Sequence, residues 1–183
     1  MLTLPHTIDN QLGERLTFKE IIVEDGIEKV LVEGVVAPGS GPAMHTHWQQ
    51  DEYISIIAGG MGYQTLGQEP QYAGPGEGVL FSKGTPHRFW NDGEEELRLE
   101  GWISPPHSVI YFLSALYAAQ AKSGNPQPEL FDGAYLVTRY RSEYDINEVP
   151  AFVKRVIMPA TVFVGRLLGK YRHFADAPAP LPG

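Results

Sequence analysis

Four residues of this chain have the types and the spacing of a single metal site. His45 and His47 form a His-x-His pair, Glu52 follows five residues later, and His87 lies 35 residues beyond Glu52. Because side chains alternate between the two faces of a strand, both imidazoles of such a pair point to one side. A carboxylate on the antiparallel partner strand can face them, and a histidine from elsewhere completes the set. Imidazole and carboxylate groups are ligands for divalent transition metals.

The composition of this ligand set indicates which chemistry it could support. Three neutral imidazoles and one carboxylate leave one or two positions of an octahedral ion open for water, a substrate or dioxygen. Such open positions distinguish a catalytic metal site from a closed structural one. The ligand types do not select one metal, so iron, manganese, nickel, zinc and copper all remain candidates. The alternative is that these are polar interior residues satisfied by hydrogen bonds, or that the ligands remain while no metal is used.

The four residues lie in two segments marked by glycines. The first segment, from Gly39 to Gly59, reads G-x5-H-x-H-x4-E-x6-G, and the second, from Gly76 to Asn91, reads G-x5-S-x-G-x2-H-x3-N. Sixteen residues separate them. These patterns resemble the two motifs of the cupin superfamily, with the single departure that Ser82 stands where a proline is usual. The departure affects a turn and leaves the ligand positions unchanged.

The resemblance covers about residues 30–105 and implies a single-domain cupin. The fold that it implies is mainly β, an antiparallel double-stranded β-helix of the cupin or jelly-roll type, to which this chain adds C-terminal α-helices. It also implies that the metal is held inside the barrel. Its ligands would then be the four residues found above: His45, His47, Glu52 and His87.

The elements that must position these residues are strands, which are predicted over residues 15–105. The segment Glu24-Asp-Gly26 is a hairpin signal between two β-branched runs. Short strands with glycine-rich turns are typical of an antiparallel barrel or sandwich. Helices are predicted near residues 109–121 and 131–141. We therefore divide the chain into a cupin barrel, a helical extension and a flexible tail, at residues 1–105, 106–174 and 175–183.

The last predicted helix combines an apolar stripe with positive charge. Apolar residues recur at three- and four-residue spacing from Val149 to Tyr171, and Pro159 lies off the stripe, where it should kink or divide the helix. Residues 148–174 hold five basic residues against one acidic, so this segment carries +4 and the rest of the chain −12. We expect the stripe to pack on the barrel or in a dimer interface. The sharper alternative is contact with an anionic membrane surface.

Strand alternation also predicts which side chains surround the metal. Ile54 and Ile56 share the inward face of Glu52, and Phe89 shares that of His87. Without an inward-facing lysine or arginine, a phosphosugar is a poor fit. An apolar-lined pocket suits a small, uncharged or weakly anionic organic molecule. The alternative is that these three residues are barrel core and nothing more.

Composition narrows the class of protein. The net charge of −8 opposes nucleic-acid binding, and the absence of cysteine excludes disulfides and thiolate metal sites. The N-terminal residues do not follow a signal-peptide pattern, and no stretch of 18 apolar residues predicts a membrane span. We therefore expect a cytoplasmic protein, a homodimer, that takes a small-molecule ligand.

Two classes of function fit these observations. One is a metal-dependent enzyme, an oxygenase with a dioxygenase-type reaction or a related isomerase or lyase, acting on a small organic molecule. The other is a non-catalytic cupin that binds or senses a small molecule through its metal. The sequence contains no helix-turn-helix or other output domain, which weakens a regulatory role, and no second acid or base can be named beside the ligands, which weakens an enzymatic one.

Overall fold

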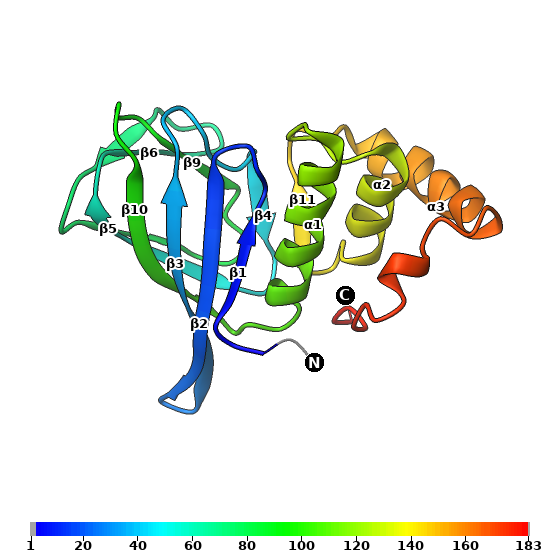
Figure 1. Cartoon of the computed structure of the whole chain (residues 1–183), viewed down its shortest axis with the longest axis horizontal. Coiled ribbons are helices and arrows are strands. Elements are labelled where there is room, and N and C mark those ends of the chain that lie inside the picture. Colours follow the sequence, from blue (N-terminus) through cyan, green and yellow to red (C-terminus); the bar gives the residue numbers. More distant parts are fainter. Residues whose placement is uncertain (1–2, 183) are drawn as a thin grey trace.

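The computed structural model describes residues 3–182, and it consists of a strand barrel with a group of helices at one end (Figure 1). The first two residues of the predicted barrel domain and the last residue of the predicted tail lie outside this range. The mainly β, antiparallel double-stranded fold predicted for the barrel is confirmed, as are the C-terminal helices.

The barrel consists of two antiparallel sheets. Within the described residues, one sheet contains, in spatial order, β1 (His6–Asp9), β2 (Glu14–Glu24), β3 (Ile27–Val36), β10 (Leu97–Ser104), β5 (Asp51–Ala58) and β8 (Gly78–Phe81). The other contains β11 (Tyr144–Ile146), β4 (His45–His47), β9 (His87–Asn91), β6 (Met61–Thr65) and β7 (Gln71–Ala73). The predicted hairpin joins β2 to β3, and Asp25 and Gly26 both have positive φ there, as a tight hairpin turn requires.

The helical extension contains two regular helices and a third that is divided. α1 (Val109–Ser123) and α2 (Leu130–Arg139) agree closely with the predicted ranges. The last predicted helix is split into a π-helical turn, η1 (Val153–Ile157), and α3 (Met158–Leu167), with a short 3-10 turn, η2 (Arg172–Phe174), after it. Pro159 lies in the first turn of α3, where its missing N–H interrupts regular bonding. Within the described residues, no helix is long and apolar enough to cross a membrane.

One apolar core joins the barrel to the extension. Phe18 and Val30 of the barrel, both fully buried, belong to the same cluster as Phe112 of α1 and Leu136 of α2. The extension also adds a strand to the barrel, because β11 pairs with β4. Strands β1 to β10 precede the predicted boundary at residue 105, but β11 follows it, and the two parts share a core and a sheet.

Composition predicts a flexible tail over residues 175–183, but part of this segment is fixed by hydrogen bonds. Arg139 of α2 donates to the carbonyls of Ala177 and Pro178. The backbone N–H of Leu181 donates to the buried carboxylate of Glu143 at 3.0 Å. These contacts hold the segment against α2 and the start of β11, because a buried carboxylate must keep its hydrogen-bond donors.

Candidate metal site

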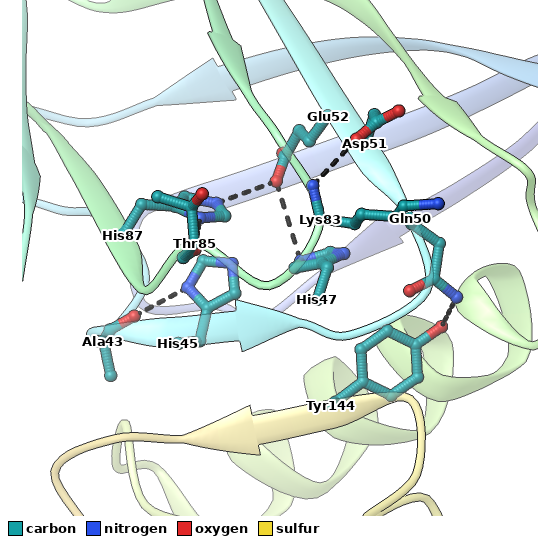
Figure 2. A network of polar contacts seen from close by, with 10 residues as sticks. All are labelled: Ala43, His45, His47, Gln50, Asp51, Glu52, Lys83, Thr85, His87 and Tyr144. Atoms are coloured by element: carbon teal, nitrogen blue, oxygen red, sulfur yellow. Dashed lines mark hydrogen bonds and ion pairs between the residues drawn. The ribbon is translucent and has the colours of Figure 1, made fainter. Parts of the chain in front are cut away.

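The four predicted ligands come together at one point inside the barrel (Figure 2). His45, His47, Glu52 and His87 each offer one ligand atom, and these atoms all lie within 4.8 Å of one another. Two donors on opposite sides of one ion, each about 2.1 Å from it, are about 4.2 Å apart. The ligand atoms therefore lie about as close together as in a metal site, with the largest permitted separation slightly above this value.

The strands supply these ligands in a different arrangement from the one expected. The antiparallel neighbour of β4 carries a histidine, since His45 pairs directly with His87 of β9. Glu52 lies on β5, which pairs with β10 and β8 in the opposite sheet. The expectation that the carboxylate sits on the partner strand of the His-x-His pair was therefore wrong. The chain crosses between the sheets after β4, so Glu52 faces the imidazoles across the barrel.

Backbone carbonyls orient two of the three imidazoles. Nδ1 of His45 lies 2.8 Å from the carbonyl oxygen of Ala43, and Nδ1 of His87 lies 2.9 Å from that of Thr85. A carbonyl only accepts, so Nδ1 of each ring carries the proton. A neutral ring then presents the lone pair of Nε2 to the centre of the cluster, which is the form that binds a metal.

Glu52 is in contact with two of the histidines. One of its carboxylate oxygens lies 3.2 Å from Nε2 of His87 and 3.6 Å from Nε2 of His47. If Nε2 of His87 carries a lone pair, two electron-rich atoms face each other, and a proton or a cation must lie between them. The donor set therefore fits a divalent cation.

The surroundings hold the ligands in the protonation states that a metal requires. Burial, with smaller contributions from His47 and His87, lowers the pKa of His45 to about 3. Burial also lowers the pKa of His47. Burial alone would raise the pKa of Glu52, but the contact with His87 and the nearby histidines outweigh it and lower that pKa to about 2. Near neutral pH, His45 and His47 are thus neutral and Glu52 is ionised.

The four ligands differ in how far they are exposed to solvent. The side chains of His47 and His87 are 6% and 1% exposed, whereas that of Glu52 is 15% exposed and His45 is also partly accessible. The ring of Phe81 stacks on His87 at a centroid distance of 4.0 Å and covers it from the barrel interior. A ligand would therefore approach from the side of His45 and Glu52.

Two polar residues beside the ligands were not found from the sequence. Gln50 is fully buried, and its Nε2 donates to the hydroxyl of Tyr144 at 3.1 Å, while its Oε1 has no partner among the described residues (Figure 2). Tyr144 belongs to β11, opposite His47, and its ring lies edge-on to that imidazole at 5.4 Å. Tyr144 lies 94 residues after Gln50, in a segment without a strand pattern. The sequence therefore gives no signal that the two residues are in contact.

The three predicted pocket residues lie in or beside a packed apolar cluster. Ile54 and Ile56 are buried together with Met61 and Leu97, and Phe89 packs at the edge of the same cluster. This arrangement fills the barrel behind the ligands. A role for these side chains in contacting a substrate stays a prediction.

The remaining motif residues shape the loops around the site. Asn91 is buried and bridges three segments, because its side chain donates to the carbonyls of Val36 and Glu95 and accepts from the N–H of Gly93. Despite Ser82 in the place of proline, the turn after β8 closes through a hydrogen bond from Thr85 to the carbonyl of Ser82. These residues position the ligand strands and do not contact a bound metal themselves.

Known proteins share the barrel and its motifs. A family model described as a cupin domain matches residues 32–104. The chain is 30% identical over 100 residues to the probable oxidoreductase virH of Hypocrea virens. The aligned region covers 50% of this chain and 46% of the relative. The chain is 33% identical over 101 residues to the oxidoreductase iacF of Pestalotiopsis fici, covering 50% of each. The chain thus spans about half the length of these curated relatives.

A solved structure shares the fold. KdgF from Halomonas sp. superimposes with a TM-score of 0.50 over 57% of this chain and 92% of that one, at 16% sequence identity. This likeness concerns the double-stranded β-helix alone. The family match covers residues 32–104, which contain the ligand positions of both motifs, so the chain contains a cupin domain, and the C-terminal helical extension follows it.

Proposed function

We propose that this protein is a metal-dependent oxidoreductase that acts on a small organic molecule, with a dioxygenase-type reaction as the first class to test. The observation that carries the proposal is the cluster of three imidazoles and one carboxylate, in which His45 and Glu52 are partly exposed. Two relatives, one named as an oxidoreductase and the other as a probable oxidoreductase, agree with it. A divalent transition metal bound there would supply Lewis-acid or redox chemistry.

The residues of the chain would contribute orientation and charge. The carbonyls of Ala43 and Thr85 hold two imidazoles with Nε2 facing the centre. Glu52 stays ionised down to about pH 2 and therefore supplies one negative charge to the site at neutral pH. The burial of His47 and His87 excludes water from their side, so a substrate would meet the site beside His45 and Glu52.

The first experiment is elemental analysis of protein purified without added metal. We expect close to one transition-metal ion per chain in the wild type. His87→Ala should weaken metal binding at least about 100-fold, because loss of even an outer partner of a ligand costs about 10–100-fold. A matched control is His107→Asn, which alters an exposed histidine outside the cluster. Absence of metal from both wild type and control would contradict the proposal.

Oxygen consumption then tests the reaction class. Protein loaded with iron, manganese, nickel or copper would be tested in an oxygen electrode against enolisable and catechol-like compounds. We expect turnover with at least one pair of metal and compound, and its loss in His87→Ala.

A second candidate is a non-catalytic cupin that binds a small molecule through its metal. The observation that favours it is the character of the polar neighbours of the ligands. Gln50 does not titrate, and burial raises the pKa of Tyr144, so neither serves as a general base near neutral pH. Tight ligand binding that needs the metal, without turnover for any metal, would favour this candidate.

A further inference from the structure

The outward side of the last helix is apolar and exposed. We define the α3 face as seven side chains in η1, α3 and the residues next to them, each between 44% and 74% exposed: Phe152, Val156, Ile157, Phe163, Val164, Leu167 and Leu168. Large contiguous apolar patches are rare on proteins that stay free in water, and they mark interaction sites. This face therefore needs an occupant.

Within residues 3–182, the seven side chains of the α3 face stay exposed. Val162 and Gly165 are the buried residues of α3, and they lie on the other side of the helix from Phe163 and Leu167. That buried side packs against α2, and a Cβ added to Gly165 would collide with the ring of Tyr171. α3 lies at the end of the molecule farthest from the barrel sheets (Figure 1). The expectation that this stripe packs on the barrel was therefore wrong, and packing in a dimer interface stays a prediction.

Positive charge surrounds this face. Arg155, Arg166, Lys170 and Arg172 are all exposed, and among residues 3–182 none of them forms an ion pair with a carboxylate. The one basic residue of the segment that does so is Lys154, which pairs with Asp145. This combination of apolar side chains and unpaired cations fits a partner that has a negatively charged surface and an apolar interior.

A cavity beside α3 gives an independent sign of an anionic ligand. It has a volume of about 570 Å³ and is bordered by three arginines, Arg139, Arg141 and Arg166. Arg139 already donates to two backbone carbonyls of the C-terminal segment, whereas Arg141 and Arg166 are exposed and form no ion pair among the described residues. Guanidinium donors without a carboxylate partner suit a phosphate group. Around the helix, Arg166 lies between Val162, which also borders the cavity, and Phe163, so the cavity opens at one edge of the α3 face.

We propose that the α3 face and the arginine cavity together dock the protein on an anionic phospholipid bilayer. The apolar side chains would enter the boundary between headgroups and acyl chains, as in amphipathic helices that lie in the plane of a membrane. The arginines and Lys170 would meet lipid phosphates, and the cavity would take one headgroup. A second copy is a poorer occupant, because a two-fold contact through this face would bring the unpaired cations of both copies together.

Co-sedimentation of the full chain with lipid vesicles tests this proposal. We expect the wild type to bind vesicles of phosphatidylcholine mixed with phosphatidylserine, to bind pure phosphatidylcholine far less, and to be released by salt. Phe163→Ser with Leu167→Ser, and separately Arg141→Gln with Arg166→Gln, should each reduce the bound fraction about tenfold or more. The matched control, Leu66→Ser with Leu80→Ser, changes two exposed leucines of the barrel and should bind as the wild type does.

Several results would overturn the proposal. These are equal binding to neutral vesicles, no binding at low salt, or binding that both α3 variants leave unchanged. Light scattering provides a further check, since a wild-type dimer that the Phe163 and Leu167 variants turn into a monomer, without vesicle binding, would assign the face to a second copy. Stabilisation by inorganic phosphate alone, without vesicle binding, would assign the cavity to a free anion. If a variant fails to fold, the lipid and salt dependence of the wild type still decides.

Discussion

The two ends of this molecule break the usual division between a polar surface and an apolar interior in opposite ways. At the barrel end, His47, Gln50 and His87 are polar and buried. At the helical end, Phe163 and Leu167 are apolar and exposed. Either arrangement costs free energy in an isolated chain, because buried polar groups lose water and exposed apolar groups order it. Each end therefore points to a missing partner, a cation in the barrel and an apolar, anionic surface at the helices.

The comparison also shows that the two ends are parts of one folding unit. Phe18 of β2 and Tyr140 next to α2 are fully buried in the same cluster. Between the ends, this cluster buries large apolar side chains from both the barrel and the helices.

The first prediction tests this comparison with the same substitution at a buried leucine and at an exposed one. Leu136 of α2 is 1% exposed, and Leu167 of α3 is 74% exposed. Leu136→Ala should lower the free energy of unfolding by about 2–5 kcal/mol, the usual cost of a cavity in a packed core. Leu167→Ala should change it by less than about 0.5 kcal/mol. Urea denaturation followed by circular dichroism measures both. A loss above about 1 kcal/mol for Leu167→Ala would mean that the α3 face is covered within the chain.

The barrel end could be predicted from the sequence further than the helical end. A metal site requires particular residue types at fixed spacings, so His45, His47, Glu52 and His87 were recognisable before any fold was known. The sheet that each ligand belongs to was not, because spacing along the chain does not tell which strands pair. The link from Tyr144 to Gln50 was hidden for the same reason, since β11 forms only through its pairing with β4.

The helical end shows what periodicity cannot reveal. The three- and four-residue spacing from Val149 predicted an amphipathic helix, and the chain is helical there apart from the π-helical turn before Pro159. The spacing identifies an apolar stripe but not what contacts it. In the structure, Val162 and Gly165 are the buried residues of α3, and a Cβ added to Gly165 would collide with Tyr171. Glycine contributes nothing to an apolar pattern, so periodicity could not show that this position is the buried one.

The second prediction concerns the effect of pH on metal-free protein. In the unfolded chain, histidine takes up a proton near pH 6.5, whereas the folded chain keeps His45 neutral down to about pH 3. The unfolded state therefore binds more protons in this window, and the free energy of unfolding falls as the pH falls below 6.5. Each such histidine contributes about 1.4 kcal/mol per pH unit. Glu52 adds a loss of the same sign below pH 4.5, because its folded pKa is about 2.

Chelator-treated protein, denatured with urea between pH 7 and pH 5, measures this slope. The matched variant His45→Gln removes one of the titrating groups, and its average slope between pH 7 and pH 5 should be smaller by about 1 kcal/mol per pH unit. Equal slopes in the two proteins would show that the burial of His45 does not resist protonation. The polar residues of the barrel site would then be less well shielded from water than the structure indicates.

The third and smallest expected effect concerns the contact by which the helical extension reaches the metal site. Tyr144→Phe removes the acceptor of Gln50 Nε2 and leaves that buried amide without a partner, which should cost about 1–3 kcal/mol. Because Gln50 lies in the chain between the ligands His47 and Glu52, releasing its side chain should lower zinc affinity, measured by competition with a chelator, by about tenfold. Tyr140→Phe is the matched control, since its hydroxyl donates to the carbonyl of Pro178, away from the ligands. It should lower stability by about 1 kcal/mol and leave zinc affinity unchanged. If both variants weaken zinc binding equally, the extension supports the site only through overall stability; if Tyr144→Phe alone does, its β11 strand is part of the metal site.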